Sequence, residues 1–240
     1  MKNPIFTGAA VAIITPMNED GTVNYDEFAK FIDFQIENGT DAIVVCGTTG
    51  ESSTLKVVEH NECIRWCVEY VNHRVPVIAG TGSNSTACAI EISQEACKNG
   101  ADALLLVTPY YNKTSQRGLI AHYTAIHDAT NLPIILYNVP SRTGVNMSVD
   151  TVKTLARKYE NIVALKQSFG DMDLITDLKM NCPKDFTIYS GDDSLTLPMM
   201  SLGARGVISV ASHIFGSEVK SMIRNYKTGE FRAAVNMHKK

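Results

Sequence analysis

The chain has 240 residues, of which 45% are hydrophobic and 20% are charged, and its formal net charge is −3. This composition is typical of a globular protein that is long enough to bury one large core. The mild acidic balance leaves no basic stripe to neutralise phosphates, so we expect no nucleic-acid partner.

Short apolar runs rich in Val and Ile alternate with longer amphipathic stretches along the chain. Runs of the first kind are typical of buried strands, and an apolar face that recurs every three to four residues predicts a helix. The predicted strands are Ala9–Ile14, Asp41–Cys46, Val75–Ala79, Ala103–Val107, Pro133–Tyr137, Ile162–Lys166, Phe186–Tyr189 and Gly206–Val210. The predicted helices are Tyr25–Asn38, Val57–Asn72, Thr86–Lys98, Leu119–Ala129, Val149–Lys158, Met172–Met180, Leu195–Leu202 and Ser217–Tyr226.

Eight strand–helix units without a linker predict a single α/β domain, a (β/α)8 TIM barrel, over residues 1–226. A doubly wound sheet is the alternative, but it usually carries a Gly-rich loop after its first strand. The segment Thr15 to Asn18 has no glycine. Residues 227–240 predict the start of a truncated C-terminal helical region, with a helix over Glu230 to Met237.

The N-terminal sequence indicates neither a membrane-spanning segment nor a signal peptide. Its longest apolar run, Ala9 to Ile14, is too short to cross a bilayer. The opening Met1 to Pro4 lacks the apolar segment of a signal peptide. We therefore expect a cytoplasmic protein that does not bind membranes.

Lys166 ends the predicted sixth strand, after the four apolar residues Ile162 to Leu165. A strand this apolar is typical of a parallel sheet that is covered on both faces. A lysine at its C-terminal end would project into the mouth of the barrel, where desolvation lowers the pKa of the ammonium group. The neutral amine can condense with a ketone or aldehyde to give a Schiff base. Lys166 is thus the candidate nucleophile, with a solvated surface lysine as the alternative.

Residues just past the C-terminal ends of the strands form the active site of such a barrel. Tyr137 ends the strand next to that of Lys166, and its hydroxyl could shuttle protons, with Thr48 extending the chain of hydroxyls. The turn from Gly47 to Gly50 offers backbone N–H groups that suit a small carboxylate. Arg142 follows the fifth strand and could bind a second carboxylate bidentately, or could merely hold its loop. Together these residues predict a 2-oxo acid substrate.

No metal site or cofactor is predicted. The six cysteines show no CxxC pair, which indicates small buried side chains in a reducing compartment. His122 and His127 are five residues apart and would diverge on a helix. Asp192 and Asp193 resemble a metal pair, but without further ligands we assign them to helix capping, because carboxylates are favoured at helix starts.

Segments spread over nearly the whole chain carry a family resemblance. They are Gly47 to Glu51, Pro76 to Gly82, Tyr110 to Asn112, Tyr137 to Gly144, Val163 to Lys166, Ser190 to Asp193 and Gly206 to Val210. Together, from Phe6 to about Ala234, they resemble the dihydrodipicolinate synthase family of class I, pyruvate-dependent aldolases. The resemblance implies a Schiff-base-forming lyase that condenses pyruvate with aspartate 4-semialdehyde, the first committed step of the bacterial diaminopimelate and lysine route.

The resemblance also implies roles for single residues. Lys166 would form the Schiff base, while Tyr137, Thr48 and Tyr111 would form a proton relay. Tyr111 would reach into the site of a neighbouring subunit, so the resemblance implies a homo-oligomer, a dimer at least and a tetramer in the family. The catalytic residues would need no cofactor.

The remaining implied residues bind the substrates. Thr48 and Thr49 would hold the carboxylate of pyruvate with their amides and hydroxyls. Arg142 would receive the carboxylate of the semialdehyde. Gly191 and Ile208 would line the pocket near the reactive lysine.

Three departures from the family pattern stand out. The family usually has Glu directly after the lysine, where this chain has Gln167-Ser168-Phe169. At the family's lysine-inhibitor cleft Ser52, His60, Asn84 and Tyr110 fit, but Val57 and Cys88 replace polar or acidic residues, which predicts weak inhibition by lysine. Family members also continue past the position of Lys240, so we expect lower stability and altered assembly, most simply a dimer.

Two other functions fit parts of the pattern. A retro-aldolase acting on N-acetylneuraminate or a 2-keto-3-deoxy sugar acid would use the same lysine chemistry, although Ser141 to Gly144 and the doubled threonine differ from such members. A non-catalytic barrel is the third hypothesis, and the intact set of candidate catalytic residues argues against it.

Overall fold

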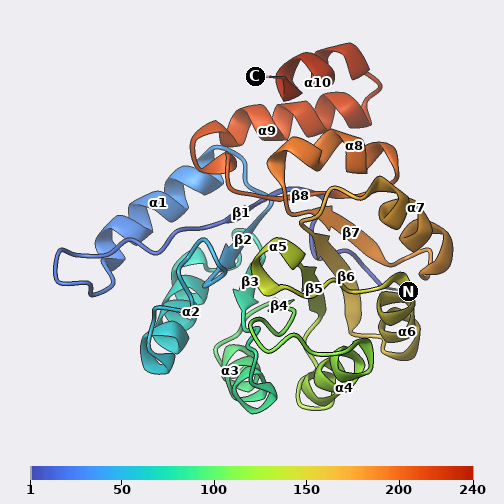
Figure 1. The fold of residues 1–240 in the computed structure, drawn as a ribbon. Helices are drawn as coiled ribbons and strands as arrows, with labels where there is room; N and C mark the ends of the chain where they lie inside the picture. Colours follow the sequence, from blue (N-terminus) through green and yellow to red (C-terminus); the bar gives the residue numbers. More distant parts are fainter. Residues whose placement is uncertain (1, 240) are drawn as a thin grey trace.

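The computed structural model describes residues 2–239 and shows a closed barrel of eight parallel strands surrounded by helices (Figure 1). The strands follow one another in sequence order, and the pairing of β1 with β8 closes the barrel. The strands are β1 (Gly8–Ala12), β2 (Ala42–Val45), β3 (Val77–Gly80), β4 (Ala103–Val107), β5 (Ile134–Asn138), β6 (Ile162–Gln167), β7 (Thr187–Ser190) and β8 (Gly206–Ser209). The predicted (β/α)8 barrel is confirmed.

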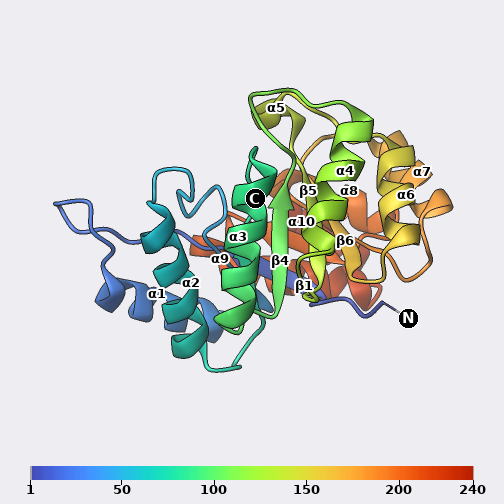
Figure 2. The same ribbon diagram turned by 90° about the horizontal axis from the view of Figure 1, so that it is seen from below.

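Helices return the chain from the end of each strand to the start of the next, as parallel pairing requires. They are α1 (Tyr25–Glu37), α2 (Val57–Val71), α3 (Thr86–Lys98), α4 (Gln116–His127), α5 (Pro140–Thr143), α6 (Val149–Lys158), α7 (Met172–Asn181), the 3₁₀ helix η1 (Asp193–Leu195), α8 (Thr196–Ser201), α9 (Ser212–Lys227) and α10 (Phe231–His238). Seen from below, β4 points toward the end of the molecule where α5 lies (Figure 2). That end is the C-terminal rim of the barrel.

The ends of α1 follow from its sequence. The side chain of Asn24 accepts a hydrogen bond of 3.0 Å from the N–H of Glu27, which satisfies one of the free donors of the first turn. The helix ends before Gly39, whose φ of +89° is a backbone conformation that glycine adopts without strain. The helix therefore begins at the predicted residue and ends at Glu37, one residue before the predicted end.

Three helices differ by more than one residue from their predicted bounds. Helix α4 begins at Gln116, three residues early, because Ser115 caps it by accepting from the N–H of Gly118. The predicted helix Leu195–Leu202 is divided between η1 and α8. Helix α9 begins at Ser212 and bends at Phe215, whose backbone is not helical.

Alternate residues of each strand point into the barrel or toward the helices, which gives two apolar layers. The layer between strands and helices contains Leu136 and Leu165, whereas the barrel interior contains Tyr137 and Ala164. The interior cluster consists of Phe6, Ala10, Ala12, Ala42, Val44, Ile78, Ala103, Leu105, Ile135, Tyr137, Val139, Val163, Ala164, Tyr189 and Ile208. This alternation decides which side chains of β5 and β6 can reach the barrel mouth.

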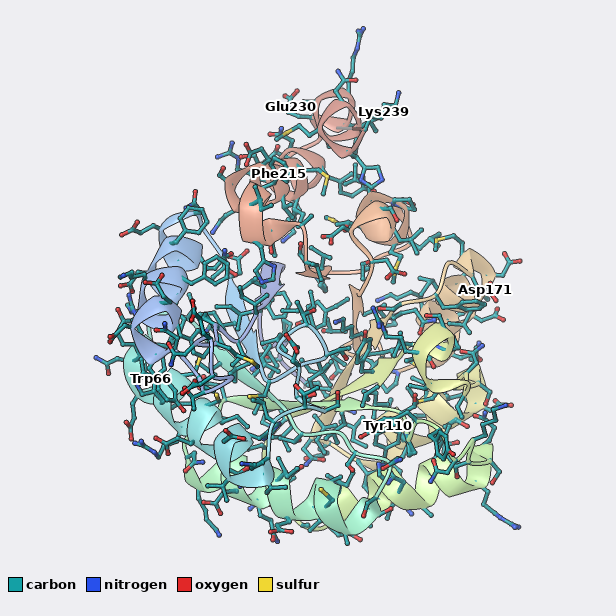
Figure 3. All side chains as sticks on the ribbon, turned by 60° about the vertical axis from the view of Figure 1, so that its left-hand side comes forward. Trp66, Tyr110, Asp171, Phe215, Glu230 and Lys239 are labelled. Atoms are coloured by element: carbon teal, nitrogen blue, oxygen red, sulfur yellow. The ribbon has the colours of Figure 1, made fainter. Side chains whose placement is uncertain are left out.

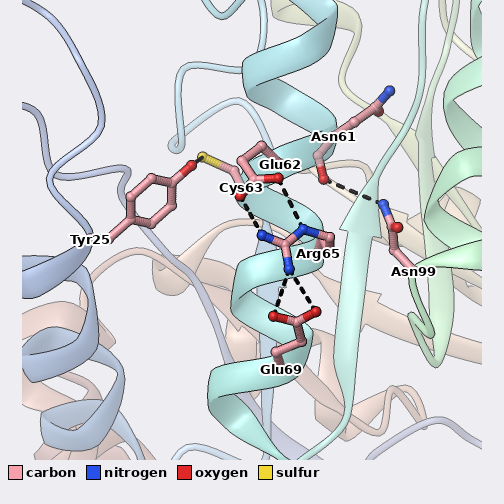
Figure 4. Close-up of polar contacts among 7 residues, drawn as sticks. All are labelled: Tyr25, Asn61, Glu62, Cys63, Arg65, Glu69 and Asn99. Carbon is pink, nitrogen blue, oxygen red and sulfur yellow. Dashed lines mark hydrogen bonds and ion pairs between the residues drawn. The ribbon is translucent and has the colours of Figure 1, made fainter.

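The outer face of α2 is polar and is tied to the neighbouring helices (Figure 4). Arg65 pairs with Glu62 and Glu69 one turn away on either side. Such exposed pairs contribute at most about 1 kcal/mol each. These pairs join successive turns of α2 and form no part of the candidate site.

Helix α10 lies outside the ring of barrel helices and packs on α9. Glu230 and Lys239 mark its two ends, beyond the part of α9 that carries Phe215 (Figure 3). Its one buried residue, Ala234, joins an apolar cluster with Met222 and Ile223 of α9. Among residues 2–239, no helix has the length and apolar character that a membrane crossing needs.

Candidate active site

Lys166 and Tyr137 lie side by side in the mouth of the barrel. They are paired in the register of β5 and β6, and both point inward because they alternate with the outward-facing Leu136 and Leu165. Lys166 Nζ lies 4.2 Å from the centre of the Tyr137 ring. The two side chains are 6% and 7% exposed, respectively, so both are largely removed from water.

This burial changes the acid–base properties of both groups. Desolvation lowers the pKa of Lys166 to about 8; the carboxylates of Asp192 and Asp193 oppose this shift, and the Arg142 guanidinium adds to it. At pH 7 such an amine is neutral in roughly one molecule in ten, against roughly one in three thousand for an ordinary lysine. Burial raises the pKa of Tyr137, so its hydroxyl stays protonated and can donate.

Gly191 forms the wall beside Lys166. Its N–H donates to the carbonyl oxygen of Gln167 at 2.8 Å, which holds the loop after β7 against β6. A Cβ atom at this position would lie 2.9 Å from Cε of Lys166 and would overlap Oγ of Ser168. Only glycine leaves room for the lysine side chain here.

The loop after β2 presents two backbone donors at the rim. Its base is held by Thr15, whose Oγ1 donates to the carbonyl oxygen of Gly50 at 2.7 Å. Within residues 2–239, the N–H groups of Thr48 and Thr49 donate to no other group. Adjacent free N–H groups of this kind suit a carboxylate.

Thr48 lines two cavities. A small one of about 30 Å³ is lined by both Thr48 and Tyr137. A larger one of about 440 Å³ is lined by Thr48 on one side and by Arg142 and Thr143 on another. Thr48 therefore stands between the buried tyrosine and the exposed arginine.

The far wall of the larger cavity contains most residues predicted for an inhibitor cleft. They are Ser52, Val57, His60, Cys88 and Tyr110. Asn84, predicted to belong with them, lines a separate cavity of about 320 Å³ near His122. Most of the predicted cleft residues thus line the same cavity as Thr48 and Arg142.

Arg142 lies on α5, a four-residue helix that the sequence analysis did not predict. Pro140 begins the helix, and Gly144 ends it with a φ of +70°. Arg142 itself is exposed and forms no salt bridge within the described chain. Its guanidinium is therefore free to bind an anion in the cavity that it lines.

Comparison with known proteins shows the family of the chain. The model of the dihydrodipicolinate synthetase family matches residues 5–240. The chain belongs to this family.

Individual relatives agree with the family assignment. The 4-hydroxy-tetrahydrodipicolinate synthase of Lachnoclostridium phytofermentans is 51% identical over 233 residues, which cover 97% of this chain and 79% of the relative. That of Citrifermentans bemidjiense is 52% identical over 98% of this chain and 80% of its own. The crystal structure of dihydrodipicolinate synthase from Aquifex aeolicus superposes with a TM-score of 0.95 at 50% identity, covering 98% of this chain and 80% of that one.

In this family member Tyr111, unlike Lys166 and Tyr137, is strongly exposed in the single chain. Its side chain is 90% exposed, and it lines neither of the cavities that contain Thr48. Its φ of +73° places a bulky residue in the left-handed region, which costs about 1–3 kcal/mol. Such strain is characteristic of residues that are held in place for a function.

The predicted capping role of Asp192 and Asp193 at their own helix is wrong. The side chain of Asp192 makes no capping bond to η1. The Asp193 carboxylate instead accepts from the N–H groups of Val210 and Ala211, both at 3.0 Å, and from the hydroxyl of Ser209. Asp193 thus joins the loop after β7 to the start of α9.

Asp192 is a site residue that sequence reasoning missed. Burial raises the pKa of its carboxyl group, and the nearby Lys166 ammonium opposes that shift. Its position two residues after the end of β7, at the C-terminal rim, was the available signal. In the described part of the chain, no three His, Cys, Asp or Glu residues are grouped to hold a metal ion.

Proposed function

We propose that this chain condenses pyruvate with aspartate 4-semialdehyde through a Schiff base on Lys166, as a 4-hydroxy-tetrahydrodipicolinate synthase of the diaminopimelate and lysine pathway. The observation that carries this is the buried Lys166 amine beside Tyr137, in a chain about half identical to synthases of that name over nearly its whole length. The enzyme is a class I aldolase-type lyase.

The first half of the reaction activates pyruvate. The neutral Lys166 amine attacks the C2 carbonyl of pyruvate to give a carbinolamine, and the loss of water then gives an iminium ion. The departing hydroxyl needs a proton, and the protonated Tyr137 hydroxyl is the donor. The free N–H groups of Thr48 and Thr49, with their hydroxyls, hold the pyruvate carboxylate, and Gly191 and Ile208 line the pocket around the adduct.

The second half forms the carbon–carbon bond. Loss of a proton from C3 of the iminium ion gives an enamine, whose C3 attacks the aldehyde carbon of the semialdehyde. Arg142 receives the semialdehyde carboxylate at the mouth of the 440 Å³ cavity, where a guanidinium forms two parallel hydrogen bonds. Attack of the substrate amine on C2 then closes the ring and releases Lys166.

The relay that moves these protons uses Tyr137, Thr48 and Tyr111. The shared cavity of Thr48 and Tyr137 supports the first link. The exposure and strained backbone of Tyr111 support a position in the neighbouring subunit's site, so we propose an oligomer that is a dimer at least. The six free cysteines support a location in the reducing cytoplasm.

Turnover measurements test this function. Purified protein should consume pyruvate only when aspartate 4-semialdehyde is present and should leave N-acetylneuraminate intact. Cleavage of N-acetylneuraminate without condensation would assign the chain to the retro-aldolases instead. The Lys166→Ala variant, which keeps the barrel but lacks the amine, serves as the matched inactive control.

A further inference from the structure

Asn138 follows Tyr137 directly but points to the opposite face of the barrel wall. Tyr137 belongs to the interior, and Asn138 has the outward orientation of Leu136. Its side chain is fully buried. In the register of the sheet it stands beside Gln167, as Tyr137 stands beside Lys166.

The Asn138 side chain closes the base of the segment that carries Arg142. Its Oδ1 accepts from the N–H of Met147 at 3.0 Å, and its Nδ2 donates to Oδ1 of Asn146 at 2.7 Å. The chain leaves the barrel at residue 138, forms α5, and is held again at residues 146 and 147. The side-chain amide of Asn138 therefore holds both ends of the segment that carries Arg142.

The same amide connects this segment to the strand of Lys166. Asn138 Nδ2 also donates to Oε1 of Gln167 at 3.0 Å. The orientation of these amides is determined by Met147, because a backbone N–H can only donate and so requires an oxygen opposite it. The Nε2 of Gln167 is buried without a partner in the described chain, so the bond from Asn138 is the one hydrogen bond that this side-chain amide makes among residues 2–239.

Arg142 depends on this backbone for its position. Its guanidinium has no ion pair within residues 2–239, and α5 consists of a single turn. The location of the guanidinium relative to Lys166 is therefore set by how residues 139–146 are held.

We propose that Asn138 is a positioning residue that determines the affinity for the second, carboxylate-bearing substrate by holding the Arg142 segment in register with Lys166. This rests on the proposed function. The pyruvate carboxylate is held by the loop after β2, and Asn138 faces away from the interior where Lys166 and Tyr137 lie. Loss of the Asn138 side chain should therefore change semialdehyde binding more than pyruvate binding.

The primary test compares Asn138→Ala with wild type. The KM for the semialdehyde should rise by roughly tenfold or more, whereas the KM for pyruvate should change by less than about threefold. Equal rises for both substrates would make Asn138 a general structural residue and would overturn the proposal.

A double-mutant cycle with Arg142→Ala gives the decisive comparison. If Asn138 acts through Arg142, then Asn138→Ala should have no further effect on the semialdehyde KM once Arg142 is alanine. Independent, multiplicative effects would contradict the inference. Wild type is assayed first, and failure to use the semialdehyde would refute the proposed function. If wild type is active but the effects of the two substitutions multiply, only the role of Asn138 is refuted.

Two further variants separate positioning from stability. Asn161 donates to the carbonyl oxygens of Thr130 and Leu132 at the other end of the same strands. Asn161→Ala should therefore lower the melting temperature without raising the KM for the semialdehyde more than the KM for pyruvate. If Asn138→Ala does not fold, Asn146→Ala removes one contact at an exposed position. It should raise the semialdehyde KM by about threefold, and unchanged affinity there would count against the proposal.

Discussion

Lys166 and Tyr137 face each other across the register of β5 and β6, with the lysine Nζ 4.2 Å from the centre of the tyrosine ring. The contact is made inside the barrel, where neither group is well solvated. The amine of Lys166 and the hydroxyl of Tyr137, which we propose as nucleophile and proton donor, are thus held together by the pairing of adjacent strands. The following predictions test how that pair and its surroundings work.

The rate at which pyruvate forms the Lys166 adduct should depend on pH. Burial lowers the lysine pKa to about 8, so the neutral amine falls about tenfold for each pH unit below that value. Adduct formation should rise roughly tenfold from pH 6 to pH 7 and level off above about pH 9. Rapid-quench borohydride trapping measures this, and a rate that is flat from pH 6 to 8 would contradict the assignment.

Tyr137→Phe should retain the ring beside Lys166 while removing the hydroxyl. Loss of a positioned proton donor lowers the rate by about 10²- to 10⁴-fold, so kcat should fall by that amount while the fold is retained. Tyr189→Phe is the matched control, because Tyr189 is also an interior tyrosine but donates to the carbonyl oxygen of Phe6 at 2.8 Å. That variant should lose about 1 kcal/mol of stability and little activity. Equal kcat losses in the two variants would argue against a proton-transfer role.

Gly191→Ala should interfere with Lys166 directly. The new methyl group would lie 2.9 Å from Cε of Lys166, so the lysine or the loop must shift. Overpacking of this kind costs about 1–3 kcal/mol and should slow adduct formation more than it lowers the melting temperature. Trapping kinetics and thermal melting of the same sample decide between a local and a general effect.

Arg142→Ala should weaken the use of semialdehyde much more than the use of pyruvate. A charge-assisted hydrogen bond contributes about 1.5–3 kcal/mol, which corresponds to a ten- to hundredfold or greater loss in kcat/KM for the semialdehyde. Arg142→Lys should recover only part of it, because an ammonium group lacks the planar fork of a guanidinium. Similar losses for the two substrates would instead indicate that Arg142 holds its loop.

Mixing two inactive variants tests whether Tyr111 acts in a neighbouring subunit. In a hybrid of Lys166→Ala and Tyr111→Phe chains, the subunit that keeps Lys166 can receive an intact Tyr111 from its partner. Activity should therefore return on mixing, after brief dissociation and reassembly. Continued inactivity in hybrids verified by native mass spectrometry would place the function of Tyr111 within its own chain.

The sequence predicted the barrel and the neighbouring positions of Lys166 and Tyr137, because both follow from the order of the strands. It did not predict α5, since four residues beginning with Pro140 are too few to show helical periodicity. The role of Asn138 was also missed, because it depends on which face of β5 each residue occupies and on where the chain returns. Asp193 was assigned to the wrong helix, since only the fold brings Val210 and Ala211 to its carboxylate.

Trapping of the pyruvate adduct tests the central claim most directly. Protein incubated with pyruvate and borohydride should gain one reduced pyruvyl group per chain, and peptide mass mapping should locate it on Lys166. The Lys166→Ala variant should gain none while keeping the circular dichroism spectrum of the barrel. A modified residue other than Lys166, or no modification of correctly folded wild type, would contradict the account.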